Sequence, residues 1–278
     1  MVSVVIPAYN AEKEISLCLD SLLNQTLPKE QYEIIVVNDG STDRTEEIIR
    51  KYDGDCFVPR NDINRVKIIT QANQGPAAAR NNGVSESKGD IIFFTDSDCV
   101  PEKNWLEEML KPFSDAEVAG VQGAYKTKQK EVVARFAQIE IEERYQKMSR
   151  NERIDFIGSY SAAYRKKEFE EQGGFDTRFP TASGEDADLS YAMSNAGRKL
   201  VFNPNAIVYH QHPQTLKRYF RQKFGRAYWR NLLYKKNMGK IIKDSYTPQL
   251  LKIQMGLLGL VIFLILIGAL TTSRLVLE

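Results

Sequence analysis

The stretch IIFFTDSDCVPE, residues 91–102, joins a run of four large apolar residues to a pair of carboxylates. A run of this length and uniform apolarity predicts a strand buried on both faces, as in a parallel sheet covered by helices. Asp96 and Asp98 follow the run closely, one residue apart. Carboxylate oxygens are suitable ligands for Mg²⁺ or Mn²⁺, and such an ion can bind a diphosphate. The stretch therefore predicts an α/β fold with a metal-binding rim.

Three further apolar runs, at residues 2–6, 33–37 and 66–69, precede this strand. Helical patterns fall between them, and this alternation is typical of a mostly parallel, Rossmann-like sheet flanked by helices. Asn10 is expected to cap the first helix. Asp43 and Glu46 are expected to form a capping box at the start of the second.

Polar segments follow each of the four runs, at residues 7–12, 38–43, 71–83 and 96–98. In a parallel sheet these ends share one edge, where ligands bind. The first segment, PAYNAE, has no glycine, and the sequence has no Walker loop, so backbone amides do not form a dinucleotide site of the dehydrogenase type. These features exclude a nucleotide-dependent oxidoreductase and favour a metal ion as the group that neutralises phosphate.

Taken in order, these motifs resemble glycosyltransferase family 2, whose members have the GT-A fold. The matching segments cover roughly residues 2–212 and read VSVVIPAYNAE, VVNDGSTD, NQGPAAARNNGV, GDIIFFTDSDCVPE, GGFD, GEDADLSYAMSNAG and VFNPNAIVYH. The resemblance implies an inverting, metal-dependent transfer of a sugar from a nucleotide sugar, UDP- or GDP-linked, to an acceptor. The implied cofactor is a divalent metal, Mn²⁺ or Mg²⁺.

The resemblance also implies roles for individual residues. A nucleotide-sugar pocket would be lined by Pro7, Ala8, Tyr9, Glu12, Asp39, Arg80, Asp96 and Ser97. Asp98 would bind the metal, with Asp96 and His210 completing the site, and His212 remains a competing ligand. In the catalytic pair Glu185–Asp186, Asp186 would be the base that takes the proton of an acceptor hydroxyl.

The sequence departs from the family pattern at three places. Ala192 stands where many relatives carry an arginine, seven residues after the glutamate of the catalytic pair, and Asn38 replaces the first acid of the common DDGS motif. The Gln-X-X-Arg-Trp motif of processive polymer synthases is missing, because Gln222 and Arg226 are one residue too far apart. We therefore expect transfer of a single sugar.

Two acceptors remain open, a hydroxyl on a lipid-linked or surface glycan and a polyprenyl phosphate. A phosphate acceptor is already ionised and needs little help from a base. The non-enzymatic alternative is a scaffold protein that binds nucleotide sugars at a membrane without catalysis.

The last third of the sequence indicates contact with a membrane. Residues 215–243 contain ten Lys or Arg and no Asp or Glu, with aromatic residues between them. This pattern predicts an amphipathic helix on an anionic membrane surface. A nucleic-acid site is not favoured, because no known nucleic-acid-binding motif accompanies the basic residues. Residues 255–270 carry no charge and predict a marginal transmembrane helix, with the preceding domain on the cytoplasmic side. We expect a GT-A catalytic domain over 1–214, a basic segment over 215–246 and a C-terminal membrane anchor over 247–278.

Overall fold

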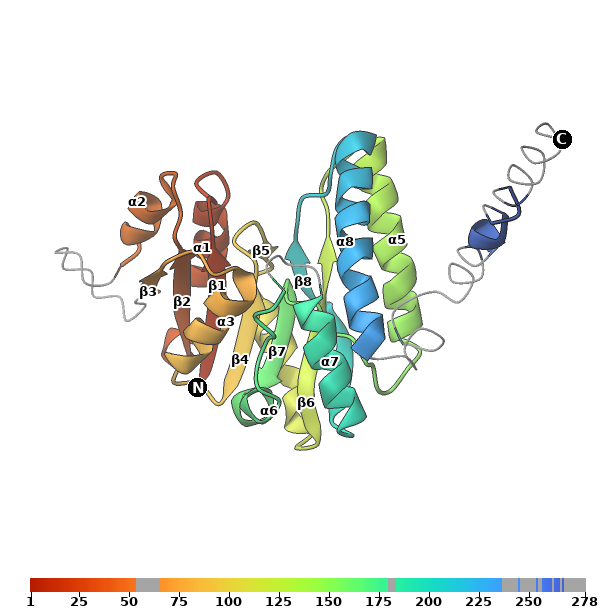
Figure 1. Ribbon diagram of the computed structural model, residues 1–278. Helices are drawn as coiled ribbons and strands as arrows, with labels where there is room; N and C mark the ends of the chain where they lie inside the picture. Colours follow the sequence, from red (N-terminus) through yellow and green to blue (C-terminus); the bar gives the residue numbers. More distant parts are fainter. Residues whose placement is uncertain are drawn as a thin grey trace, which may run out of the picture.

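The computed structural model describes residues 1–53, 66–179 and 184–236, together with Ser245 and scattered positions between 254 and 267. It contains an eight-stranded sheet of order β3-β2-β1-β4-β7-β6-β8-β5 (Figure 1). The strands are β1 Val2–Ala8, β2 Tyr32–Asp39, β3 Val66–Gln71, β4 Ile91–Thr95, β5 Val100–Pro101, β6 Val118–Lys126, β7 Ser161–Arg165 and β8 Lys199–Tyr209. The four apolar runs of the sequence therefore correspond to β1, β2, β3 and β4, as predicted.

The first four strands are parallel, and β1 lies between β2 and β4. The chain runs from β1 outward to β3 and then returns to the other side of β1, which creates a topological switch point between β1 and β4. In the second half β6 and β8 pair parallel, whereas β7 pairs antiparallel with both β4 and β6, and β5 pairs antiparallel with β8. The complete sheet is therefore mixed, with four parallel and three antiparallel pairings.

Helices cover both faces of the sheet (Figure 1). The helices described are α1 Ile15–Leu23, α2 Thr45–Arg50, α3 Pro76–Ser85, α4 Trp105–Leu110, α5 Val132–Met148, α6 Lys166–Glu171, α7 Glu185–Asn195 and α8 Leu216–Lys236, with short 3₁₀ turns at Lys29–Gln31 and Lys111–Ser114. The predicted apolar face of α1 is buried at Ile15, Cys18, Leu19 and Leu22. Most of the chain packs around one core that includes the fully buried Phe94.

The predicted helix caps are wrong. The N-cap of α1 is Glu14 and that of α2 is Arg44, and neither makes a side-chain capping bond. Asn10 bonds to loop residues. Asp43 does accept bonds from the amide and hydroxyl of Thr45, the first residue of α2, but Glu46 bonds to Asn38 and Arg50, so the predicted capping box does not form. Pro76 does occupy the first turn of α3, after Gly75, as its fixed φ favours.

Helices α5 and α8 lie side by side at the edge of the molecule farthest from β3 (Figure 1). The ring centroids of Phe136 and Tyr219 are 5.8 Å apart, and Lys223 forms a 2.7 Å ion pair with Glu140. The basic amphipathic helix predicted after residue 214 is thus present as α8. Among the described residues, no helix has the length and apolarity needed to cross a membrane. The predicted transmembrane run, 255–270, lies partly outside them, and its described positions are helical.

Candidate active site

The loops that follow β1 and β2 are tied together beside the switch point. Asn10 adopts a φ of 50°, its side-chain oxygen accepts a 2.8 Å bond from the Thr42 amide, and its own amide donates to Ser41 Oγ. Glu12 accepts bonds from both the backbone and the side chain of Arg44. Of the other predicted pocket residues in the first loop, Pro7 and Ala8 end β1 and are buried, whereas Tyr9 is 50% exposed. An exposed ring on this rim is available to stack on a base.

Asp39, the last residue of β2, fixes the loop between β3 and α3. Its Oδ1 accepts bonds from Gln71 Nε2 and the Gln74 amide, and its Oδ2 accepts one from the Gly75 amide, all at 2.8–2.9 Å. Gly75 has a φ of 88°, which favours glycine and aims its N–H at the carboxylate. Oδ2 receives a single bond from the described residues and retains a lone pair that a nucleotide base could use.

Arg80, on α3, joins the two halves of the site. It is 1% exposed and donates a 2.7 Å bond to Asp96 and a 2.9 Å bond to Glu185. Its guanidinium also lies 5.6 Å from the ring centroid of Phe175. The sequence predicted Arg80 near the diphosphate, but it gave no sign of the contact with Glu185, 105 residues away.

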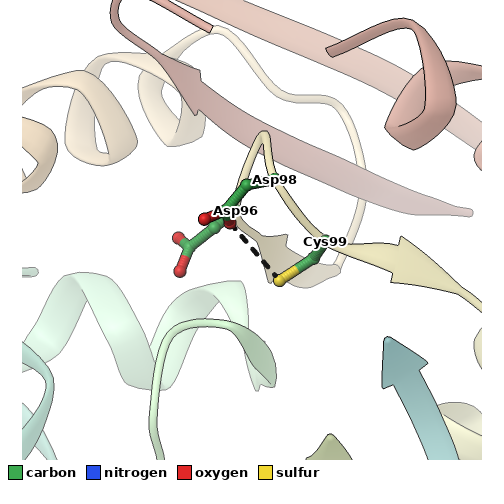
Figure 2. Close-up of side chains that lie close together, drawn as sticks. All are labelled: Asp96, Asp98 and Cys99. Carbon is green, nitrogen blue, oxygen red and sulfur yellow. Dashed lines mark hydrogen bonds between the residues drawn. The ribbon is translucent and has the colours of Figure 1, made fainter. Parts of the chain in front are cut away.

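Asp96, Asp98 and Cys99 cluster in the turn between β4 and β5 (Figure 2). Ser97, half-buried, lies between the two aspartates in the chain. Burial, reinforced by the negative charges of Asp96 and Asp98, raises the pKa of the Cys99 thiol well above its usual value. The thiol therefore stays protonated and is a poor ligand for a hard cation, so the carboxylates are the donors of interest.

His210, immediately after β8, faces this cluster. Its Nε2 lies 3.2 Å from Asp98 Oδ2, close to the spacing of about 3 Å between adjacent ligands on an octahedral ion. Burial opposes the charge on both side chains, but their mutual hydrogen bond outweighs it, lowering the pKa of Asp98 and raising that of His210. His210 Nδ1 is buried without a hydrogen-bond partner among the described residues. Among the described residues, ligand atoms of Asp96, Asp98 and Cys99 lie within 4.8 Å of one another, and His210 reaches this group through Asp98. Carboxylates and an imidazole are donor types that suit Mn²⁺ or Mg²⁺.

His212, the competing ligand, is committed elsewhere. Gln138 donates from Nε2 to the Tyr125 carbonyl and to Glu142, so its Oε1 accepts the 2.9 Å bond from His212 Nε2. That nitrogen therefore carries the proton and has no lone pair for a metal. Burial, and then the nearby His210, lowers the pKa of His212 to about 4. The geometry favours His210 over His212 as the ligand.

Glu185 and Asp186 begin α7 and differ in their surroundings. Glu185 is 1% exposed and bonds to Arg80 and to the Gly184 amide. Asp186 is half-buried and accepts a bond from the Ala187 amide. Burial, and then the charge of Glu185, raises the pKa of Asp186 to about 7. Asp186 thus has the properties of a proton acceptor near neutral pH, whereas Glu185 holds Arg80 in place.

Two further features were not predicted, a cavity beside α7 and an aromatic ring beside His210. Ala192, which replaces the arginine of many relatives, lines a cavity of about 470 Å³ together with Gly174, Asp176 and Asp188. Tyr125, at the end of β6, packs its ring 5.4 Å from His210 and 4.3 Å from Tyr160, measured between centroids. The position of Tyr125 depends on pairing between distant strands, and no local motif indicates it.

Comparison with known proteins identifies the class of this domain. The sequence matches the family description "Glycosyl transferase family 2" over residues 3–173 and "Glycosyl transferase family group 2" over residues 91–276. The chain belongs to glycosyltransferase family 2, as the resemblance implied. The solved mannosyltransferase PcManGT from Pyrobaculum calidifontis, in complex with GDP-Man and Mn²⁺, shares the fold with a TM-score of 0.62. It is 21% identical in sequence, and the match covers 77% of this chain and 58% of that one.

Two curated relatives are similar over most of this chain. Probable glycosyltransferase YdaM of Bacillus subtilis is 34% identical over 232 residues, which cover 80% of this chain and 53% of YdaM. This chain thus spans about half the length of that relative. A protein of Methanococcus voltae is 25% identical, with 97% of this chain and 82% of the relative covered. Its name is dolichyl N-acetyl-alpha-D-glucosaminyl phosphate 3-beta-D-2,3-diacetamido-2,3-dideoxy-beta-D-glucuronosyltransferase.

Proposed function

We propose that this protein transfers a single sugar, with inversion, from a UDP- or GDP-linked donor to a lipid-linked or surface-glycan acceptor at a membrane face. The observation that carries the proposal is the bridge made by Arg80. It bonds to Asp96, on the side of the nucleotide rim, and to Glu185, next to the candidate base. Donor-binding groups and a proton acceptor are thereby held against each other, as group transfer requires.

The reaction is a single displacement at the anomeric carbon. The acceptor oxygen attacks from the face opposite the leaving group, the new C–O bond forms, and the bond to the nucleoside diphosphate breaks. Asp186 takes the proton of the acceptor hydroxyl, a role for which a pKa of about 7 is well matched. Glu185 and Arg80 orient the start of α7, and the exposed ring of Tyr9 contributes to binding the base of the donor.

A divalent ion is part of the proposal. Asp98, His210 and Asp96 would hold it, and when bound it would stabilise the negative charge that develops on the departing diphosphate. The complex of PcManGT with GDP-Man contains Mn²⁺, which supports this role through the shared fold. The contact of Asp98 with His210 supports the choice of residues.

Two observations favour an acceptor carried by a lipid. The Methanococcus voltae relative is named for a dolichyl-phosphate-linked sugar. In this chain, Ser245 exchanges hydrogen bonds of 2.6–2.9 Å with Asp155. The loop that contains Asp155 also bonds to α7, through Ile157 and Ser190. Ser245 is thus held against the loop that contacts α7.

Membrane attachment through the C-terminal run belongs to the same proposal. The described large apolar residues between positions 257 and 267 are helical and 42–64% exposed. Apolar side chains that find no cover in the protein are stabilised by lipid.

Transfer assays test the function. The full chain is incubated with Mn²⁺, with radiolabelled UDP-Glc, UDP-GlcNAc or GDP-Man, and with either a polyprenyl phosphate or a polyprenyl-linked glycan. We expect one donor to label the lipid-linked glycan, and Asp186→Asn to abolish the labelling. Labelling of the polyprenyl phosphate, little affected by Asp186→Asn, would assign the phosphate as acceptor. Donor binding without turnover on any acceptor would instead indicate a nucleotide-sugar-binding scaffold.

A further inference from the structure

Helices α5 and α8 start at the same end of the molecule and run side by side (Figure 1). Contacts at two successive levels fix their register. Phe136 packs against Tyr219, and one turn further along, Glu140 accepts bonds from Lys223 and from the Tyr219 hydroxyl. Tyr219 is buried at this contact. The inner face of α5 packs on the core through Ala134, Ile141 and Tyr145, so the outward side of the helix pair is the one that can carry a common surface.

That surface is apolar on both helices. Val132, Phe136 and Ile139 are 84%, 55% and 55% exposed on α5, and Leu216, Phe220 and Phe224 are 61%, 64% and 84% exposed on α8. Each set recurs at three- or four-residue intervals and so forms a stripe along its helix. Tyr219 contacts both Phe136 and Phe220, which joins the two stripes. We refer to these six residues as the two-helix face.

Positive charge surrounds the two-helix face. The exposed cations of residues 126–148 and of α8 with described side chains are Lys126, Lys128, Lys130, Arg135, Lys217, Arg218, Arg221, Arg226 and Lys235. The exposed acids are Glu131, just before α5, and Glu142 and Glu143 toward its end, whereas residues 216–236 contain no Asp or Glu, so cations outnumber acids around the face. An apolar stripe edged by Lys and Arg is typical of helices that lie in a membrane interface.

We infer that the two-helix face docks on an anionic lipid surface, with Phe136 and Ile139 of α5 entering the bilayer interface beside Phe220 and Phe224 of α8. The sequence pattern indicates membrane contact for α8 but not for α5, so the contact by α5 follows from the structure alone. A second copy of the chain fits this face poorly, because a two-fold interface would bring the same cations against each other. Anionic headgroups neutralise them instead.

The position of the face relative to the active site agrees with this assignment. Gln129, just before α5, bonds to the backbone of His212 in both directions. Leu216 follows His210 by six positions, so the start of α8 lies within about 20 Å of the candidate metal ligand. A bilayer that contacts the face would therefore hold headgroups near the rim. Lipid contact itself does not depend on the proposed reaction.

Lipid contact at α5 can be measured on the full chain. Phe136→Trp places a fluorophore in the two-helix face, and Leu17→Trp provides a matched control at a 60% exposed position of α1. The native Trp105 and Trp229 contribute the same background to both variants. Each variant is reconstituted into vesicles of phosphatidylcholine, with and without phosphatidylglycerol, in which the acyl chains are brominated to quench nearby tryptophan.

We expect brominated anionic vesicles to remove most of the emission added by Trp at position 136 and little of that added at position 17. Quenching at position 136 should fall when phosphatidylglycerol is omitted or when salt is raised. Equal quenching at both positions, or none at position 136, would overturn the assignment. A blue shift at position 136 that depends on protein concentration without lipid, with no quenching by lipid, would assign the face to a second copy.

Discussion

Arg80 and Glu185 form a 2.9 Å ion pair in which each side chain is 1% exposed. The pair joins α3, which follows the nucleotide-binding half of the sheet, to the first residue of α7. Both charges are removed from water, so each depends on the other for its stabilisation. Asp96, which follows β4, shares the same guanidinium, so one buried cation links the end of β4 to the start of α7.

Removing Arg80 should be strongly destabilising. Arg80→Met keeps most of the side-chain volume but leaves the buried Glu185 carboxylate without its cation, and we expect a loss of about 3–5 kcal/mol in the free energy of unfolding. Urea unfolding of both proteins measures it. Arg178→Met is the matched control, because Arg178 pairs with Asp176 at 2.7 Å but is 74% exposed, and should lose far less stability than Arg80→Met. Equal losses in the two variants would contradict the burial argument.

Asp186→Asn should separate binding from turnover. The amide keeps the shape of the side chain but cannot accept the proton of a hydroxyl, so we expect nearly unchanged donor affinity and a rate lower by about 10²-fold or more. Isothermal titration with the donor and single-turnover transfer measure the two effects. Asp188→Asn, which changes another acid in the first turn of α7, should retain most of the rate. Full activity of the Asp186 variant on a hydroxyl acceptor would exclude Asp186 as the base.

The same residue should make stability depend on pH. The folded pKa of Asp186, about 7, lies above its unfolded value of 3.8. Between these values the unfolded chain ionises while the folded carboxyl keeps its proton, so the folded state loses stability as pH rises from about 4 to about 7. Asp186→Asn removes this loss. Its melting temperature should match wild type near pH 4 and exceed it increasingly up to pH 7, as calorimetry can record. A constant difference across this range would mean that the pKa is not raised.

The sequence predicted the sheet better than it predicted the loops. Apolar runs identify β1 to β4 because a strand buried on both faces leaves a continuous signal within one segment. Asn10 shows the opposite case. Its residue type and position suggest a helix cap, yet it bonds to Ser41 and Thr42, in a loop some thirty residues later. The tertiary contact occupies the side-chain oxygen of Asn10 that a helix cap would have used. A local sequence pattern does not reveal such a contact.

The candidate site likewise contains features that local motifs predict and features that depend on tertiary contacts. The motif order located Asp96, Asp98, Glu185, Asp186 and His210, because each stands at the end of an element. The sequence did not show that Glu185 is held by Arg80 or that His212 bonds to Gln138, since both contacts join segments more than 70 residues apart. The different roles of two histidines in one motif follow from their partners, which only the fold defines.

The two histidines also provide a test of the metal site. His210→Gln removes an imidazole that lies 3.2 Å from Asp98, and we expect Mn²⁺ binding in the presence of a nucleoside diphosphate to weaken at least about 10-fold. His212→Gln is the matched control, because His212 Nε2 donates to Gln138 and glutamine can replace that donor. Its Mn²⁺ affinity should stay close to that of wild type, although its unfolding free energy can fall. Titration calorimetry with MnCl₂ measures both variants. A greater loss of Mn²⁺ affinity in the His212 variant would assign His212, and not His210, as the metal ligand. Unchanged affinity in both variants would show that neither histidine binds the metal.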